Sequence, residues 1–201
     1  MKRAAAIALA CALLQPPAAL AGAQIYEPMS DSVRNRLQLA VSASRAPVLQ
    51  FDRAEDAHRW SYQMSSRLRA RMPDRKQRDE FLKMVHYYCT QHQKLDPQLV
   101  LGLIQVESGF KKYAVSSAGA MGFMQVMPFW VKVIGKPRDR LFDTRTNIVY
   151  GCAILRHYLD IENGDYFRAL GRYNGSLGRA EYPNAVLAHW KGRWAYDGPT
   201  R

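Results

Sequence analysis

The stretch Asp96–Phe110, DPQLVLGLIQVESGF, decides how this chain is interpreted. Asp96 is a typical helix N-cap and Pro97 suits the first helical position, so a helix is predicted to begin here. Its apolar residues are Leu99, Val100, Leu103 and Ile104, and it delivers Glu107 at its end. Apolar surroundings disfavour the ionised form of a carboxyl group, which keeps it protonated as a general acid requires at neutral pH. Taken alone, Glu107 could equally cap the helix or pair with Lys111 or Lys112 on the surface.

The flanking sequence predicts further helices and no strands. Upstream, apolar residues recur at three- and four-residue steps from Asp52 to Leu68, and a second such run covers Phe81 to Cys89. Downstream, a small and glycine-rich segment at 116–122 predicts a tight loop. Further helices are expected from Pro128 to Ile134, from Asp143 to Asn163, and from near Asp165 and Pro183. Because no stretch alternates apolar and polar residues between hairpin turns, the chain is predicted to be all-α and to form one main domain at 51–201.

The N-terminal residues indicate export. Residues 1–23 combine Lys2 and Arg3 with an apolar run and a stretch of small residues, which predicts a signal peptide cleaved after Ala21 or Ala23. The apolar run is too short for a membrane span, so no integral span is expected. Cys11 raises lipid attachment as an alternative, but its surroundings match the attachment motif poorly. Residues 24–50 lack sustained apolar periodicity and are interpreted as a linker or partly ordered arm. We therefore expect a periplasmic or secreted protein.

The charge of the chain points to an anionic partner. It has 29 Lys and Arg residues against 17 Asp and Glu residues, a formal net charge of +12. Nucleic acid attracts such chains, but no nucleic-acid motif is present and an exported protein meets little of it. Bacterial cell wall, whose glycan strands and stem peptides carry carboxylates, suits both the charge and the compartment.

The cysteines and histidines bear on cross-links and metals. Once the signal peptide is removed, Cys89 and Cys152 form an even pair in an oxidising space, which predicts a disulfide; two buried free thiols are the alternative. His86 and His92 lie six residues apart, on different faces of a helix, so they do not share a metal ion. No metal or other cofactor is expected.

Four segments, taken in order and spacing, resemble a known family. They are 107–110 (ESGF), 114–128 (AVSSAGAMGFMQVMP), 147–151 (NIVYG), and Tyr173-Asn174 followed by Tyr182-Pro183. Together they resemble the soluble lytic transglycosylase (SLT) domain, a group of peptidoglycan-cleaving enzymes in the lysozyme-like superfamily. The resemblance runs from about Phe81 to Trp190 and implies the lysozyme-like helical fold shared with goose-type lysozyme.

The resemblance implies that Glu107 is the catalytic acid. It would protonate the β-1,4 glycosidic oxygen between N-acetylmuramic acid and N-acetylglucosamine while the muramyl N-acetyl group stabilises the cationic centre. Ionised Glu107 would then take the proton of the muramyl C6 hydroxyl, leaving a 1,6-anhydro end without consuming water. Most glycosidases use two carboxylates, and residues 108–138 contain no second one, although Asp139, Asp143 or Asp165 could fold back toward the site.

The same resemblance suggests substrate-binding roles for five residues, each with a structural alternative. Gln125 would bind the sugar chain and orient the glutamate, or simply pack; Ser116 would lie near the acid and the acetamido group, or cap a turn. Met127 would line the cleft, or fill the core. Tyr173 would bring its hydroxyl toward Glu107, or serve as a core aromatic residue. Asn174 would contact sugar, or fix the local backbone.

Two other functions remain open at this point. A hydrolytic muramidase of the lysozyme type would use the same fold with water as the acceptor. A non-catalytic glycan-binding protein could dock to an envelope or secretion machine through the arginine-rich segment around Arg67, Arg69 and Arg71. The expected partner in every case is peptidoglycan, with no nucleic acid, and the protein is expected to be a monomer.

Overall fold

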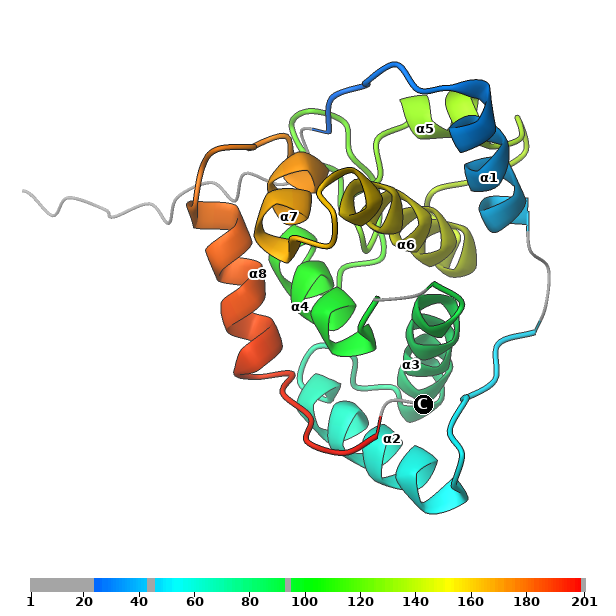
Figure 1. Cartoon of the computed structure of the whole chain (residues 1–201). Helices are drawn as coiled ribbons and strands as arrows, with labels where there is room; N and C mark the ends of the chain where they lie inside the picture. Colours follow the sequence, from blue (N-terminus) through cyan, green and yellow to red (C-terminus); the bar gives the residue numbers. More distant parts are fainter. Residues whose placement is uncertain (1–23, 43–45, 93–94, 200–201) are drawn as a thin grey trace, which may run out of the picture.

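A computed structural model describes residues 24–42, 46–92 and 95–199. The predicted signal peptide at 1–23, with Cys11, lies outside these residues. The described part contains eight helices and no strand, which confirms the all-α prediction (Figure 1). The helices are α1 (Asp31–Ser42), α2 (Ala54–Leu68), α3 (Arg75–Thr90), α4 (Pro97–Glu107), α5 (Phe129–Ile134), α6 (Thr144–Ile161), α7 (Tyr166–Asn174) and α8 (Glu181–Lys191).

Aspartate side chains fix the start of four of these helices. Asp74, Asp96, Asp143 and Asp165 each occupy the N-cap position, and each accepts a hydrogen bond from a backbone N–H group in the first turn of α3, α4, α6 and α7 respectively. These N–H groups have no partner within the helix, so the caps satisfy donors that would otherwise need water. The sequence signals at Asp96, Asp143 and Asp165 therefore predicted the helix starts correctly.

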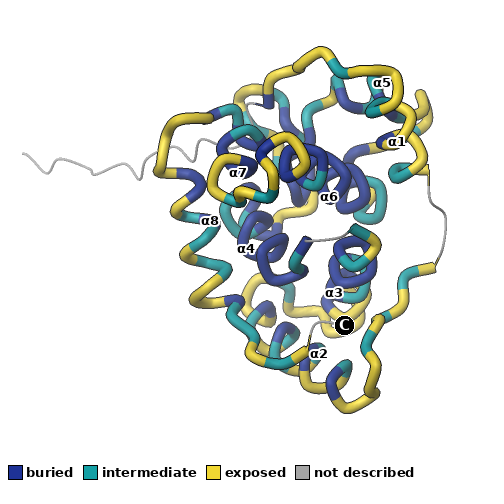
Figure 2. Tube along the Cα trace, in the orientation of Figure 1, coloured by how far each residue is buried: buried dark blue, intermediate teal, exposed yellow. Residues whose placement is uncertain are grey.

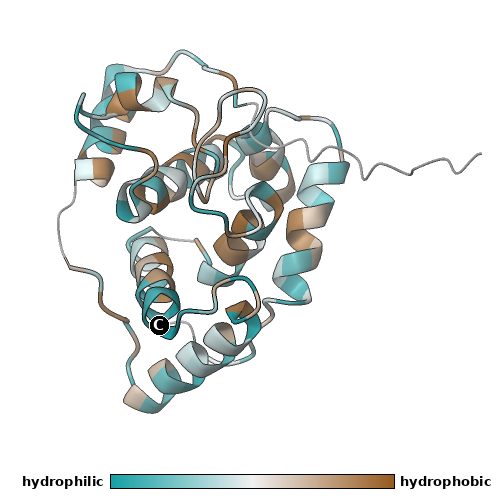
Figure 3. Cartoon of the chain, turned by 180° about the vertical axis from the view of Figure 1, so that it is seen from behind, coloured by the Kyte–Doolittle hydropathy of each residue, from teal (hydrophilic) through white to brown (hydrophobic). Residues whose placement is uncertain are grey.

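Helix α4 forms the centre of the fold. Nearly all of its residues are buried, and it packs against α3 on one side and α8 on the other (Figures 1 and 2). Seen from behind, α4 is largely hydrophobic, whereas α2 at the lower edge presents mostly hydrophilic turns (Figure 3). Because α4 ends at Glu107, the hydrophobic core itself carries the carboxyl group to its position.

The segment interpreted as a linker or partly ordered arm contains helix α1. This helix lies against α5 and α6, and Leu37 is its only buried residue. Arg36 also forms an ion pair with Asp160 of α6, with 3.4 Å between Nη2 and Oδ2. A single buried side chain gives no apolar periodicity, which explains why the sequence pattern did not indicate this helix.

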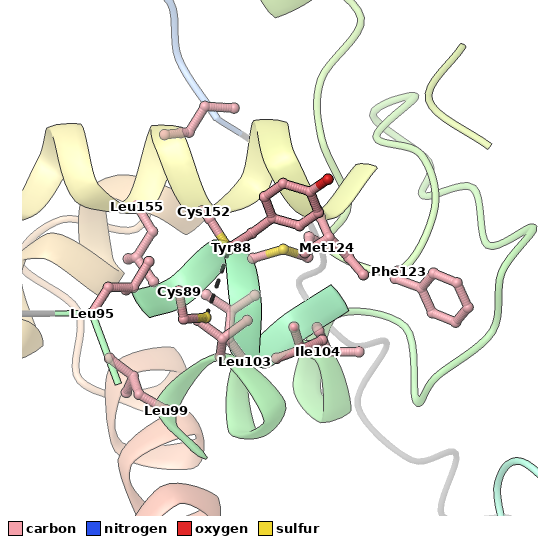
Figure 4. Close-up of a cluster of buried hydrophobic side chains, with 14 of the residues drawn as sticks. Tyr88, Cys89, Leu95, Leu99, Leu103, Ile104, Phe123, Met124, Cys152 and Leu155 are labelled. Atoms are coloured by element: carbon pink, nitrogen blue, oxygen red, sulfur yellow. Dashed lines mark hydrogen bonds between the residues drawn. The ribbon is translucent and has the colours of Figure 1, made fainter. Parts of the chain in front are cut away.

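The predicted disulfide is not formed. Cys89 of α3 and Cys152 of α6 face each other in the core with their sulfur atoms 3.8 Å apart, and both are free thiols (Figure 4). They are fully buried, and burial raises the pKa of the Cys89 thiol well above its ordinary value. The alternative interpretation, two buried free thiols that pack as small apolar side chains, is the one that the structure supports.

Across the described residues, no helix is both long enough and apolar enough to span a membrane.

Candidate active site

Glu107 occupies a buried position with one free oxygen. Its side chain is 4% exposed, and its Oε1 accepts a hydrogen bond from the Tyr182 hydroxyl over 2.5 Å. Its Oε2 is buried and has no hydrogen-bond partner among the described residues. Burial raises the pKa of Glu107 to about 8, while the hydrogen bond from Tyr182 acts in the opposite direction. Desolvation therefore dominates, and the carboxyl group is mainly protonated at pH 7.

This geometry places the acidic proton on a defined atom. Oε1 already receives the Tyr182 proton, so the proton of the neutral carboxyl group resides on Oε2. A neutral carboxyl with its O–H group unpaired can donate to a reacting oxygen atom without first breaking an internal hydrogen bond. The arrangement suits general acid catalysis.

The loop at 114–126 packs beside Glu107 and is held in place by hydrogen bonds from α6. Asn147 donates hydrogen bonds to the carbonyls of Met121 and Leu141 and accepts one from the Met124 N–H, each over 2.8 Å. Ser108, the neighbour of Glu107, donates to the Phe123 carbonyl over 2.8 Å. These contacts join the end of α4, the loop and α6 into one unit.

Two glycines allow this close packing. Gly122 has a φ angle of 78°, and a Cβ atom there would lie 2.4 Å from Nδ2 of Asn147. A Cβ atom on Gly151 of α6 would lie 2.3 Å from the Met124 sulfur. Both distances are too short for a side chain, so the loop requires glycine at each position.

Gln125 and Ser116 bond within this loop. Gln125 is buried, with a φ angle of 47° that is unusual for a residue other than glycine. Its amide nitrogen donates to the carbonyls of Gly122 and Ala114, over 2.9 and 3.1 Å. The Ser116 hydroxyl accepts from the Ala120 N–H over 3.0 Å, as a turn cap does. The structural alternatives account for these contacts, and substrate roles for both residues stay predictions.

Tyr182, rather than Tyr173, makes the hydrogen bond to Glu107. The Tyr173 hydroxyl donates to the Met124 carbonyl over 2.8 Å and so supports the loop. Burial first, and then the nearby carboxyl of Glu107, raise the pKa of Tyr173, so the two groups lie within electrostatic reach. The sequence motif contained Tyr182-Pro183, but nothing in its spacing identified Tyr182 as the partner of the acid. Asn174 is buried at the end of α7, where Gly175 follows in the left-handed conformation.

Met127 is half-buried in the segment just before α5, where it contacts Gln24. Its backbone N–H donates to Oε1 of Gln24 over 3.3 Å. The indole N–H of the buried Trp130 donates to the same oxygen over 3.0 Å. Sequence reasoning assigned no role to Gln24 or Trp130, because neither belongs to the four matched segments.

The other candidate carboxylates are engaged in structural roles. Asp143 and Asp165 cap α6 and α7, while Asp139 accepts hydrogen bonds from the Tyr150 hydroxyl and the Lys136 N–H. Among the described residues, no carboxylate contributes to the raised pKa of Glu107. Glu107 therefore stands as a single acid, without the second carboxylate of most glycosidases.

A groove of about 800 Å³ opens beside the same loop. It is bordered by Met121 from the loop and by Leu141 and Phe142 from the segment before α6. Tyr113 stands at its edge with 71% of its surface exposed, in edge-to-face contact with Phe142 at 5.7 Å between ring centroids. Apolar walls with a few polar groups are typical of small-molecule and sugar sites.

A family model described as "Transglycosylase SLT domain" matches residues 86–186. The chain is 37% identical over 112 residues to a transglycosylase of Enterobacteria phage PRD1. The match covers 52% of this chain and 41% of the phage protein. It is 38% identical over 106 residues to the membrane-bound lytic murein transglycosylase C of Haemophilus influenzae (strain PittEE). That match covers 45% of this chain and 30% of the relative. The chain thus spans less than half of the length of these relatives.

A solved structure shows a more distant similarity. The 70 kDa soluble lytic transglycosylase of Escherichia coli aligns with 80% of this chain and 27% of its own, at 19% identity and a TM-score of 0.44.

Proposed function

This chain belongs to the Transglycosylase SLT domain family, and from that premise we propose that it is a peptidoglycan lytic transglycosylase. The observation that carries the proposal is the state of Glu107, a lone, buried carboxyl group with a pKa of about 8 and a free Oε2. The family match spans the residue and the loop packed beside it. The proposed catalytic unit is residues 51–201, with Glu107 as the catalytic acid.

The proposed reaction uses Glu107 twice. The Oε2 proton moves to the glycosidic oxygen, the bond between this oxygen and muramyl C1 breaks, and the carbonyl oxygen of the muramyl N-acetyl group bonds to C1. The Glu107 carboxylate then takes the proton of the C6 hydroxyl, whose oxygen bonds to C1 and displaces the acetamido oxygen. The product is a 1,6-anhydro sugar, no water is consumed, and Glu107 is protonated again.

A pKa near 8 is matched to this double role. The group must give up a proton in the first step and recover one in the second, and a value near the working pH allows both transfers. The hydrogen bond from Tyr182 stabilises the carboxylate that exists between the two steps. Since no carboxylate among the described residues contributes to the pKa of Glu107, the substrate's own N-acetyl group is the proposed stabiliser of the cation.

The remaining site residues are proposed to bind the glycan strand. Three of them lie in or next to the loop at 114–126, namely Ser116, Gln125 and Met127. The other two, Tyr173 and Asn174, lie at the end of α7, and Tyr173 bonds to the loop. The groove beside Tyr113 is proposed to provide room for further sugars next to this loop. The net charge of +12 favours the carboxylate-bearing wall polymer.

We also propose a location in the bacterial envelope. Relatives of this chain are named membrane-bound lytic murein transglycosylases. Cleavage of the predicted signal peptide at 1–23 would leave the protein periplasmic or secreted, as a monomer. Docking of an envelope or secretion machine to the segment around Arg67, Arg69 and Arg71 remains part of this proposal.

Mass spectrometry of fragments released from purified peptidoglycan tests the function. The protein is expected to release fragments ending in 1,6-anhydro-muramic acid, the Glu107→Gln variant none, and the exposed-residue control Glu181→Gln the normal amount. Products one water heavier, with reducing ends, would instead establish a hydrolytic muramidase. No release by any of the three proteins would favour a binding role.

A further inference from the structure

The first described residues of the chain, Gln24–Glu27, lie on the active-site face. Gln24 is 4% exposed, although it belongs to an extended segment outside any helix. Its side-chain oxygen accepts hydrogen bonds from the Met127 N–H and the Trp130 indole N–H. Its side-chain nitrogen donates to the Gln125 carbonyl over 3.4 Å. One carboxamide thus satisfies two donors and one acceptor of the site.

The site filled by Gln24 adjoins the proposed machinery. Gln125 and Met127 are predicted glycan-binding residues, and both contact Gln24 through their backbones. Tyr173 lies within electrostatic reach of both the Gln24 amide and the Glu107 carboxyl. The Gln24 side chain therefore reaches the region next to the catalytic acid.

The rest of the segment is held by contacts that can exchange readily. Glu27 forms an ion pair with Arg172 of α7 over 2.7 Å, and 46% of its side chain remains exposed. Tyr26 contacts Phe129 edge-on at 5.9 Å between ring centroids and is 45% exposed. Exposed ion pairs and half-exposed rings stabilise a segment only weakly, so a ligand can compete with it.

We propose that Gln24–Glu27 is an autoinhibitory strap, whose Gln24 carboxamide occupies the place of a substrate acetamido group. This inference rests on the proposed function, since N-acetylated sugars are its substrate. An acetamido group offers a carbonyl acceptor and an N–H donor, the same pair that Gln24 presents to Trp130, Met127 and Gln125. Glycan and strap then compete for one site.

Competition of this kind lowers the apparent affinity for glycan. Only molecules with the strap withdrawn can bind, so the apparent Kd equals the intrinsic Kd divided by the withdrawn fraction. Removing one hydrogen-bonding anchor of the strap is expected to tighten binding by about three- to tenfold. Loss of the ion pair at Glu27 is expected to tighten it less, by about twofold.

The test measures binding of the N-acetylglucosamine tetramer by calorimetry. The Glu107→Gln background prevents turnover, and the strap variants are Gln24→Ala and Glu27→Gln. Their matched controls are Gln91→Ala, on the exposed C-terminal end of α3, and Asp31→Asn, whose ion pair with Arg34 lies within α1. The strap variants are expected to bind more tightly, and the controls to match the background protein.

A second measurement follows the strap directly. Gln24→Ala is expected to shift the NMR signal of the Trp130 indole N–H, and tetramer added to the Glu107→Gln protein is expected to shift it too, because the bond to Gln24 is lost. Unchanged or weaker binding by both strap variants would overturn the proposal, as would no binding by any variant. If binding tightens but peptidoglycan yields no anhydro products, the strap stands and the proposed reaction fails. If peptidoglycan yields anhydro products but the strap variants bind the tetramer with unchanged affinity, the proposed reaction stands and the strap fails.

Discussion

The Tyr182 hydroxyl donates a hydrogen bond to Oε1 of Glu107 over 2.5 Å, linking the first turn of α8 to the last residue of α4. The bond opposes the dominant effect of burial on the pKa of Glu107, which still reaches about 8. Burial and the Glu107 carboxyl together raise the pKa of Tyr182, so the phenol remains a donor at neutral pH. Tyr182 therefore moderates the raised pKa of Glu107 and determines the oxygen on which its proton resides.

Removing this hydroxyl is expected to slow the reaction and shift its pH dependence. In Tyr182→Phe the carboxylate formed after the first proton transfer loses its donor, which raises the barrier by about 1–2 kcal/mol, or roughly five- to thirtyfold. The pKa of Glu107 rises further because the opposing hydrogen bond is gone. In a pH profile of kcat/KM, the alkaline limb should therefore move to higher pH. An alkaline limb at the wild-type position would show that another group controls it.

Tyr173→Phe is expected to act on stability instead. The Tyr173 hydroxyl satisfies the buried carbonyl of Met124, and its loss leaves that oxygen unpaired. The free energy of unfolding should fall by about 1–3 kcal/mol, measured by denaturant titration. The alkaline limb of the activity profile should stay where it is, in contrast to Tyr182→Phe. A shift of this limb would place Tyr173 in direct control of Glu107.

Glu107→Gln is expected to stabilise the fold at neutral pH. The folded carboxyl keeps its proton up to about pH 8, whereas the unfolded chain loses it near the ordinary value of 4.5. The folded state thus binds more protons between these values, so the stability of the wild type falls as pH rises through this window. The variant lacks this loss. Its free energy of unfolding should exceed that of the wild type by roughly 3–5 kcal/mol at pH 8 and by little below pH 4.5. Thermal unfolding of both proteins from pH 4 to 9 measures the difference; a constant difference would contradict a raised pKa.

Two glycines of one loop offer a matched pair of substitutions. Gly122→Ala introduces a Cβ atom 2.4 Å from Asn147 in addition to strain at a φ of 78°, so it should displace the loop and cost several-fold in activity. Gly119→Ala carries similar strain at a φ of 86° but meets no atom within 4 Å, so about 1 kcal/mol of stability is the expected loss. Activity assays and thermal unfolding of the two variants separate contact from strain. Equal effects would show that Asn147 does not hold the loop at Gly122.

Local sequence signals predicted the helices well because their physics is local. An aspartate at an N-cap, a proline after it and apolar residues at helical spacing act within one or two turns, so α4 and α6 could be placed from their own residues. Helix α1 was not foreseen because its stability depends on contacts with α5 and α6, which are distant in sequence. The resemblance likewise identified Glu107, and the apolar run before it explained the raised pKa.

The contacts within the site were harder to foresee. Tyr182 and Tyr173 sit in the same motif, and only the packing of α8 on α4 decides which hydroxyl meets the carboxyl group. Gln24 lies over 80 residues from Glu107 in a segment with no motif, so nothing local indicated its place beside Met127. The disulfide prediction failed for a related reason: the pairing of Cys89 with Cys152 was correct as a contact, but spacing alone does not determine oxidation.

The two unlinked thiols also determine what the protein needs in order to mature. Because the core closes around Cys89 and Cys152 as free thiols, its packing is complete without a covalent bond. Protein made and kept under reducing conditions is therefore expected to reach this fold, and its cooperative thermal unfolding in the presence of a reductant would show it.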